Sequence, residues 1–502
     1  MGRQKNLMLL MFGASLVLGF VSGLTIFSQS IRLDESQSLW AASHTFEGVL
    51  RFVAQDVHTP LYPILLHVWL TAFGYNIITA RILSLVFFLL SLVVLWLVLT
   101  ENVEKRLILI SFVVVTFSPF LVWYGSEARM YTLFMFFTLL NVLFYLRMVS
   151  QPIGGWQKWG VWYFLAGVGG VYTHYFFFLL LGVEAMYGLW RGISRQVEWK
   201  WVRNLALAQG GMLLALSPWI WFALKQGLFR NMAPSLTRPS LYGLMVGWVE
   251  YFIGYQSIKM TGTVLSLWPV AVLGVILFLT TWVKTKIKHV GFWLLWAVVP
   301  WAVTFVVSFW KPVFLPRYLI FTLPAILIVT SWIVVEVFRL RTRVWVLATI
   351  MIIMLGLFWR ESDLEASRVV ENYNKVALAL NSEVGLTDKV VVSSPFTIIP
   401  LEYQFYHPNR IETIPKWNRY FPGPIPAFEM AKMEAQINEY KKTYTRLFVL
   451  LSYDQGYETK IQDYLDHNLE RLDQKEYSTN MKLFVYRLRY DIDVPHLTAE
   501  RP

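Results

Sequence analysis

The sequence predicts a mainly α-helical fold, a polytopic membrane bundle followed by a small soluble α/β domain. Of its 502 residues, 56% are hydrophobic and only 15% are charged, which is more apolar than a single water-covered domain tolerates. The apolar residues form about eleven long runs, and the composition becomes charged and mixed after Trp359. These observations assign 1–359 to a transmembrane domain and 360–502 to a soluble domain.

Composition also excludes several kinds of site. The chain has no cysteine, so it cannot contain a disulfide, a thiolate metal site or a cysteine nucleophile. Its net charge is +12, but the basic residues lie in short clusters between apolar runs and form no continuous basic face. The charge therefore indicates membrane topology rather than nucleic acid, and the lipid bilayer is the expected partner.

The apolar runs are long enough to cross a bilayer, which takes about 20 residues each. The first has a basic flank but lacks a signal-peptide cleavage site, so we interpret it as an anchor. Glycines 167, 169 and 170 mark either a break between two spans or a kink within one. The predicted spans are 7–28, 81–100, 107–123, 130–148, 159–173, 175–190, 204–224, 264–283, 290–309, 318–338 and 344–359.

Basic clusters in alternate loops set the predicted orientation, because such loops are cytoplasmic by the positive-inside rule. The alternation is coherent only if 159–190 crosses the membrane twice. The N-terminus is then inside, and everything after about residue 360 is outside. The clusters are Arg3 with Lys5, Lys105 with Arg106, Arg147 with Lys158, Arg191 to Arg203, Lys284 to Lys288, and Arg339 to Arg343.

The first outward loop, 29–80, contains two amphipathic stretches, 35–42 and 46–55, and an apolar stretch, 58–74. We predict that 58–74 is a helix lying in the interface, because a further span there would put Glu127 in the cytoplasm and break the charge alternation. Acids gather in the first two outward segments, which suggests that chemistry occurs at the outer face. They are Asp34, Glu35, Glu47, Asp56 and Glu127.

The C-terminal domain has alternating helical and strand patterns, which predict a small α/β sandwich. Helices are expected at 366–381 and 457–469, buried strands at 388–394 and 446–452, and an edge strand at 481–488. We find no glycine-rich phosphate loop and no ligand-spaced histidines there, so no chemistry is assigned to it.

Each candidate residue also has a structural interpretation. Asp34 suits a helix N-cap for 35–42, and Glu127 suits a salt bridge with Arg129 or a helix start. Single interfacial histidines such as His58 and His174 commonly satisfy local hydrogen bonds. Lys311 and Arg317 at the outer end of a span could snorkel towards water, or bind a lipid-linked phosphate.

Six segments, in order, resemble the GT-C class of glycosyltransferases, within the family 39-type group of protein O-mannosyltransferases and lipid A aminoarabinose transferases. The resemblance covers about 325 residues and does not reach the soluble tail. The segments are LDES (33–36), HTPLYPILLHVW (58–69), TARILSLVF (79–87), SPFLVWYGSEARMYTL (118–133), YTHYFFFLLL (172–181) and FLPRYLIFTLPA (314–325).

The resemblance implies an inverting enzyme that moves a hexosyl or pentosyl group from a polyprenyl-phosphate carrier to a protein, glycan or lipid acceptor. The active site would lie on the extracytoplasmic face of the plasma (inner) membrane. Asp34 would be the general base, Glu127 the second acid and Glu35 a supporting residue. The implied donor phosphate-binding residues are Arg81, Arg129, Lys311, Arg317 and Tyr318, and the implied substrate pocket contains His58, Tyr62, His174 and Tyr175.

Two positions depart from the aminoarabinose transferases. His58 stands where they have a lysine, and Gln37 stands where they have an arginine, which argues against that sugar. Asp34 and Glu35 with distant Glu127 are not a compact ligand set, so no metal is expected to be required, although a divalent ion bridging carboxylates and phosphate is an alternative.

Two other classes of function are alternatives. A transporter or flippase of lipid-linked sugars would share the many spans and the outer basic residues, but it would line a path through the membrane with polar groups. Here the acids gather on one side. A receptor-like protein acting through its tail would tolerate changes at Asp34.

Overall fold

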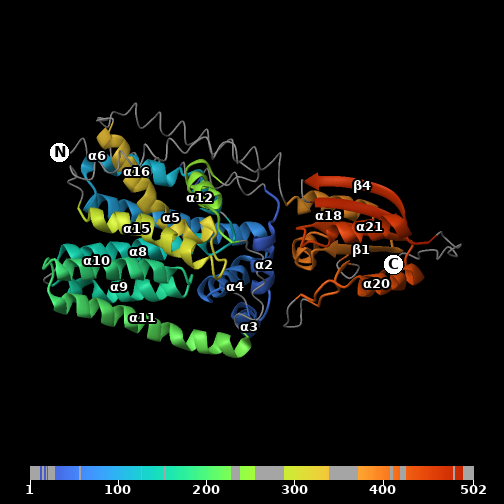
Figure 1. Cartoon of the computed structure of the whole chain (residues 1–502), viewed down its shortest axis with the longest axis horizontal. Coiled ribbons are helices and arrows are strands. Elements are labelled where there is room, and N and C mark those ends of the chain that lie inside the picture. The colour runs from blue at the N-terminus through green and yellow to red at the C-terminus, as the bar shows by residue number, and fades with distance from the viewer. Residues whose placement is uncertain are drawn as a thin grey trace. The chain divides into compact units, whose positions relative to one another are not determined.

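In the computed structural model the chain folds into a helical unit and an α/β unit (Figure 1). The helical unit comprises Met1–Ser28 and Ala41–Asp363, and the α/β unit comprises Gln29–Trp40 and Leu364–Pro502. Residues 29–40, which the sequence analysis placed in the transmembrane domain, therefore group with the C-terminal part of the chain. The structure describes residues 29–55, 58–125, 127–151, 154–227, 238–254, 288–337, 371–407, 411–418, 425–478 and 481–489, with six isolated residues before position 29.

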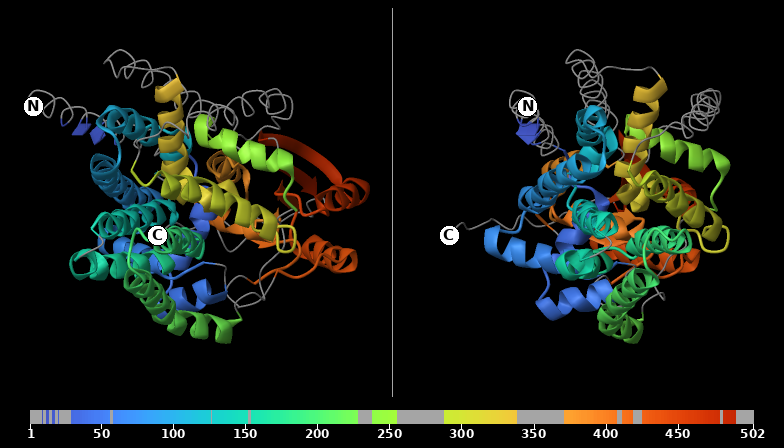
Figure 2. Two further views of the ribbon diagram at one scale, coloured as in Figure 1. Left: turned by 60° about the vertical axis from the view of Figure 1, so that its left-hand side comes forward. Right: turned by 90° about the vertical axis from the view of Figure 1, so that its left-hand side faces the viewer.

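Helices make up the helical unit because a backbone in apolar surroundings must satisfy its hydrogen bonds internally. Helix α8 packs against α5, α9 and α10, as Figures 1 and 2 show from several sides. The elements are α3 (Phe46–Gln55), α4 (Leu61–Phe73), α5 (Ile77–Asn102), α6 (Lys105–Thr116), α7 (Pro119–Gly125), α8 (Tyr131–Ser150), α9 (Gly155–Val171), α10 (Phe177–Ile193), α11 (Trp199–Gln226), α12 (Leu241–Ile253), α15 (Val290–Val307), η2 (Pro316–Thr322) and α16 (Leu323–Val337).

Five helical stretches among the described residues are long and apolar enough to cross a membrane. They are α5, α8, α11, α15 and Pro316–Glu336; helices α6 and α7, bent by 54°, would form a sixth span. These stretches make the chain an integral membrane protein. The predicted spans 264–283 and 344–359, and all but isolated residues of 7–28, lie outside the described residues, so the count of eleven and the orientation stay predictions.

The stretch 159–190 contains two helices, α9 and α10, separated by a turn at 172–176. Its glycines do not make the break, because they lie inside α9. A Cβ atom at Gly169 would lie 2.2 Å from the ring of Phe137, and one at Gly170 would lie 2.1 Å from the ring of Phe177. These glycines therefore allow aromatic side chains to pack directly against the helix backbone.

The outward loop forms the helices that its sequence predicts, α3 and α4, the second of which begins only after Pro60. That α4 lies in the membrane interface remains a prediction. Helix α12 was not predicted, because it is short for a span. Its start has a recognisable signal, since the Ser240 side chain accepts a hydrogen bond from the Gly243 amide.

The α/β unit is built on a five-stranded sheet in the order β2-β1-β3-β5-β4. Strands β2, β1 and β3 are parallel, whereas β5 runs antiparallel to both β3 and β4. Its elements are α2 (Leu33–Ala42, of which residues up to Trp40 belong here), α18 (Tyr373–Glu383), β1 (Asp388–Ser393), η3 (Pro395–Thr397), α19 (Ile398–Glu402), β2 (Ile411–Thr413), α20 (Met430–Thr443), β3 (Arg446–Ser452), α21 (Glu458–Asn468), β4 (Glu470–Ser478) and β5 (Met481–Arg487).

Most expectations for this unit are confirmed: strands β1 and β3, helix α21, and helix α18 from Tyr373 onward. Residues 366–370 of the first predicted helix lie outside the described residues. The expectation that 481–488 forms an edge strand is wrong, because β5 lies between β3 and β4. Strand β4 occupies that edge and was missed, because its sequence ERLDQKEYS is mostly charged and its side chains are exposed or half-buried.

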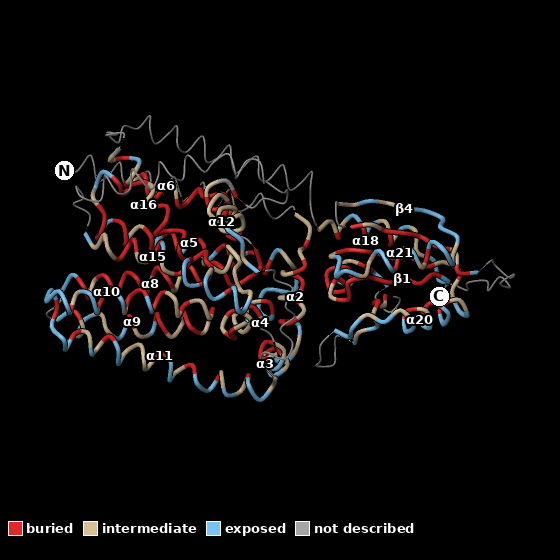
Figure 3. The backbone as a smooth tube through the Cα atoms, viewed as in Figure 1, coloured by how far each residue is buried: buried red, intermediate tan, exposed pale blue. Residues whose placement is uncertain are grey.

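Side chains alternate between two cores on the faces of the sheet, as the pleat requires. Val390 and Val392 of β1 join the core beneath α18 and α19, whereas Val391 joins the core beneath α20 and α21. The central strands are therefore buried on both sides, as Figure 3 shows for β1. Trp40 of α2 packs against the first of these cores.

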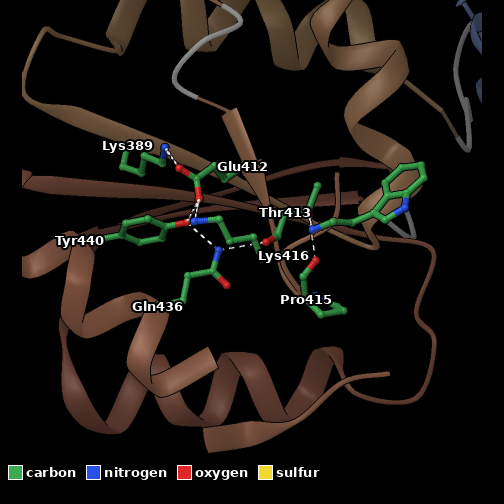
Figure 4. A network of polar contacts seen from close by, with 8 residues as sticks. Lys389, Glu412, Thr413, Pro415, Lys416, Gln436 and Tyr440 are labelled. Carbon is green, nitrogen blue, oxygen red and sulfur yellow. Dashed lines mark hydrogen bonds and ion pairs between the residues drawn. The ribbon is translucent and has the colours of Figure 1, made fainter. Parts of the chain in front are cut away.

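A polar network ties β1 and β2 to helix α20 (Figure 4). The Lys389 ammonium, whose side chain is 3% exposed, lies 2.5 Å from Glu412 Oε1, and the Tyr440 hydroxyl donates to Glu412 Oε2 at 2.8 Å. Burial alone would raise the pKa of Glu412, but the hydrogen bonds from Lys389 and Tyr440 hold it below its usual range. Lys416 is an exposed third partner of this carboxylate, at 3.5 Å.

Glu412→Ala should destabilise this part of the sheet strongly, because it leaves the Lys389 ammonium buried without its carboxylate, at a cost of about 3 kcal/mol. Hydrogen exchange of β1 and β2 amides in the full-length protein should then be about 100-fold faster. Lys416→Ala removes only the exposed partner and should change exchange by less than about fivefold. Equal exchange in the two variants would contradict a dominant role for the buried pair.

Candidate active site

Helix α2 begins with a capping arrangement around its acidic first turn. Glu35 Oε2 accepts a hydrogen bond from the Arg32 amide at 3.1 Å, as the third-position carboxylate of a capping box does. The Ser36 amide donates to the Arg32 carbonyl at 2.9 Å, which closes the first turn. Glu35 is only 1% exposed. It therefore holds the start of the helix, while a supporting role in catalysis remains a prediction.

Asp34 is the second residue of α2 and is half-buried. Because Arg32 occupies the cap position, the interpretation of Asp34 as the N-cap is wrong. Side-chain hydroxyls hold the backbone on either side: Ser36 donates to the Leu33 carbonyl at 2.7 Å, and Ser38 donates to the Asp34 carbonyl at 3.2 Å. The Asp34 backbone is thus held within a well-bonded turn.

Two residues from the C-terminal part of the α/β unit lie beside this turn. Glu371 Oε2 accepts a hydrogen bond from the Leu33 amide at 2.5 Å, and Glu371 Oε1 accepts one from the Tyr453 hydroxyl. Burial, with the nearby charge of Asp34, raises the pKa of Glu371 to about 6, even though the hydrogen bonds from Tyr453 and Leu33 act in the opposite direction. Asp34 therefore lies near a second carboxylate.

In the helical unit, Arg129 and His58 are paired directly. Arg129 Nη2 donates to His58 Nε2 at 2.7 Å. Since a guanidinium can only donate, Nε2 is the accepting nitrogen, and neutral His58 carries its proton on Nδ1. Arg129 is 7% exposed and lies in the turn between α7 and α8, where its amide bonds to the Glu127 carbonyl at 2.7 Å.

Hydroxyl groups connect α4 and α5 to the same turn. The Tyr62 hydroxyl lies 3.3 Å from Ser84 Oγ, which also donates to the Arg129 carbonyl at 3.4 Å. The first amide of α4, that of Leu61, donates to the Tyr172 carbonyl at 3.0 Å. The start of α4 is therefore attached to the α9–α10 turn as well.

His174 lies in that α9–α10 turn and stacks on Phe134, with ring centroids 4.7 Å apart and planes 10° apart. His174 Nδ1 accepts a hydrogen bond from the Phe176 amide at 3.1 Å. Burial, with electrostatic contributions from His58 and Arg129, lowers the pKa of His174 to about 3. His174 is therefore neutral at physiological pH, with its proton on Nε2.

Arg317 and Tyr318, at the start of η2, approach the same residues. The Tyr318 ring lies 5.4 Å from His174, and the Arg317 guanidinium lies 5.8 Å from the Tyr318 ring. Tyr124 of α7 interacts electrostatically with both Glu127 and Arg317. The structure thus brings most predicted site residues of the helical unit together, in a group we name the Arg129 cluster: His58, Tyr62, Glu127, Arg129, His174, Arg317 and Tyr318.

The remaining predicted residues lie on neighbouring elements. Arg81, in the first turns of α5, is 1% exposed. Lys311 is exposed in the turn after α15. The Tyr175 hydroxyl accepts a hydrogen bond from Trp219 Nε1 of α11 at 3.1 Å. Their roles in binding donor or substrate stay predictions.

Four residues near these groups were missed by the sequence analysis: Ser84, Glu250, Glu371 and Tyr453. Glu250 is 7% exposed, lies on apolar helix α12 and interacts electrostatically with Tyr124. A lone acid in an apolar helix is a signal that the sequence does offer. The sequence offers no such signal for Glu371, because its partner Leu33 lies 338 residues away.

Within the described part of the chain, no group of three or more His, Asp or Glu side chains could hold a metal ion. That catalysis requires no divalent ion stays a prediction from the sequence.

The fold of this chain is similar to that of two solved structures of the protein ArnT. ArnT from Cupriavidus metallidurans, bound to undecaprenyl phosphate, matches with a TM-score of 0.59 at 13% identity over 98% of this chain and 99% of that one. Its apo structure matches with a TM-score of 0.60 at 12% identity, over 97% and 98% of the two chains. No family model matches the chain, and no curated protein matches it in sequence. The predicted GT-C fold is thus confirmed, including the C-terminal part that the motifs did not reach.

His58→Ala should lower the thermal stability of the purified protein, because a buried charged donor, Arg129, loses an acceptor, at a cost of about 2 kcal/mol. His58→Gln supplies an amide oxygen at similar reach and should restore most of the loss. His407→Ala, at an exposed histidine of the α/β unit, is the matched control and should leave the melting temperature unchanged. A His58→Gln variant as unstable as His58→Ala would contradict this role.

Proposed function

We propose that this protein is a glycosyltransferase that moves a sugar from a polyprenyl-phosphate donor to an acceptor hydroxyl. The observation that carries the proposal is the similarity, over nearly the whole length of both chains, to ArnT bound to undecaprenyl phosphate. The Arg129 cluster, which collects buried cationic and aromatic side chains, supports it, because a lipid-linked phosphate needs positive charge in surroundings with little water.

Asp34 is the proposed general base. An acceptor hydroxyl is a weak nucleophile at neutral pH, so Asp34 takes its proton as the oxygen attacks C1 of the sugar. The bond from C1 to the phosphate oxygen breaks, and the polyprenyl phosphate leaves with the bonding electrons. Attack on the face opposite the phosphate inverts the anomeric centre.

Arg129 and Arg317 are the proposed phosphate ligands, assisted by Arg81, Lys311 and Tyr318. Negative charge grows on the leaving phosphate in the transition state, and fixed guanidinium groups stabilise it without reorganisation. No acid is needed to protonate this leaving group. The proposed reaction therefore requires no metal, although it leaves room for one.

Glu127 is the proposed second acid, and His58, Tyr62, His174 and Tyr175 line the proposed sugar pocket. By the resemblance drawn from the sequence, His58 and Gln37 stand where the aminoarabinose transferases have a lysine and an arginine. The Nε2 of His58 is engaged by Arg129, which makes His58 a poor substitute for a free ammonium group. The proposed donor therefore carries a sugar other than aminoarabinose. Reaction on the extracytoplasmic face of the plasma (inner) membrane follows from the basic loops.

Asp34→Asn should lower kcat by about 1,000-fold, because it removes the base while preserving size. The measurement is transfer of radiolabelled sugar from polyprenyl phosphate to a panel of acceptors by purified protein. Glu47→Gln, at an exposed acid one helix further along, is the control and should retain full transfer. Wild-type transfer by Asp34→Asn would remove Asp34 from the base role.

Arg317→Ala should weaken binding of the polyprenyl-phosphate donor by about tenfold or more, with a much smaller effect on the KM of the acceptor. Direct binding of undecaprenyl phosphate to the purified variant measures the first effect without turnover. Arg51→Ala, at an exposed arginine paired with Glu47, should leave donor binding unchanged. Equal losses for donor and acceptor would place Arg317 outside the phosphate site.

A further inference from the structure

The Leu33 amide, at the start of helix α2, donates its hydrogen bond to the side chain of Glu371, which is distant in the sequence. The first amides of a helix have no partner within it. Glu35 satisfies the Arg32 amide from inside α2, whereas Glu371 satisfies the Leu33 amide from 338 residues away. Glu371 therefore acts as an external cap, next to the residue that carries the proposed base.

Tyr453 holds Glu371 in turn. Its hydroxyl donates to Glu371 Oε1, and its backbone has a φ of 60°, in the left-handed region that residues other than glycine rarely adopt. This conformation is fixed by the neighbouring strands: Ser394 Oγ donates to the Tyr453 carbonyl at 2.9 Å, and the Ser394 amide donates to the Ser452 carbonyl at 2.9 Å. The strained residue is thus locked where β1 and β3 end.

Strands β1 and β3 end at the topological switch point of this sheet. The order β2-β1-β3 means that the connections after β1 and before β3 leave on opposite faces, with α19 in one core and α20 in the other. Ligands of parallel α/β sheets bind outside the carboxyl ends of the strands at such a switch point. Here Tyr453, just after β3, is linked through Glu371 to the Leu33 amide of the chain's own segment 29–40.

Two further contacts hold that segment on either side of Asp34. Ser30 Oγ donates to Asn374 Oδ1 at 3.0 Å and accepts from the Asn374 amide at 3.2 Å. On the other side, Trp40 packs against the core that includes Tyr373 and Val390. The segment is therefore attached before, at and after the turn that carries Asp34.

We propose that the C-terminal α/β domain positions the proposed base, with Glu371, held by Tyr453, fixing the first turn of α2 and thereby the Asp34 carboxylate. This inference rests on the proposed function of Asp34. Glu371 is a positioning residue: it contacts the backbone beside Asp34 and takes no part in bond formation. The domain to which the sequence assigned no chemistry thus determines where the base lies.

The first test is kinetic. Glu371→Ala should lower kcat at least tenfold while the KM for the lipid donor changes less than about twofold, because a misplaced base slows the chemical step without weakening donor binding. Glu371→Gln keeps an oxygen that can accept from Leu33 and should recover much of the loss. Glu476→Ala, at an exposed glutamate of strand β4, is the matched control and should behave as wild type.

The second test does not depend on turnover. Because the natural chain has no cysteine, Ser30→Cys with Asn374→Cys introduces the only two thiols. Oxidation should link them within one chain, seen as loss of both free thiols by mass spectrometry without dimer formation. The oxidised protein should remain as active as the same protein after reduction.

The outcomes separate the two proposals. A failure to form the intramolecular link, a loss of activity on oxidation, or wild-type kcat in Glu371→Ala would overturn the positioning role. If the link forms but Asp34→Asn retains full transfer, the proposed base is wrong, while the attachment of segment 29–40 to the domain still holds.

Discussion

The cost of burying a polar group without a partner governs both units of this protein. In the helical unit it forces the backbone into helices and favours pairing of buried polar side chains, as with Tyr163, whose hydroxyl donates to the buried Glu184 at 2.7 Å. In the α/β unit it places Glu412 against the buried ammonium of Lys389. In both examples the buried charged group lies where two different helices or strands meet.

The Arg129 cluster shows how this constraint gathers polar side chains into a candidate site. Its residues come mainly from turns and helix starts, because continuous helices leave few polar positions: Arg129 lies between α7 and α8, His174 between α9 and α10, and Arg317 at the start of η2. Packed helices hold these turns, so side chains far apart in the sequence are placed within hydrogen-bonding or ring-stacking distance. The packed helices supply the frame, and the turns carry the polar side chains of the proposed site.

The acidic turn of α2 is organised differently, since it folds with the α/β unit. Glu35 closes the turn from within, and Glu371 completes it from outside. One boundary between the units therefore runs inside α2, between Trp40 and Ala41, in addition to the boundary at Asp363, near the change of composition. A boundary judged from composition alone misses this, because a short segment can join a domain through a few specific contacts.

The sequence by itself determined the class of fold, since apolar runs of span length and alternating patterns in the tail depend only on local composition and periodicity. It also determined which residues of the motifs are candidates, such as Asp34, Arg129 and His174. The tertiary structure alone decided that Asp34 lies inside a turn, that His58 accepts from Arg129, that charged β4 forms the sheet edge, and that Glu371 caps α2. Those features depend on contacts between segments up to hundreds of residues apart, and no local pattern encodes which distant partner a polar group will find.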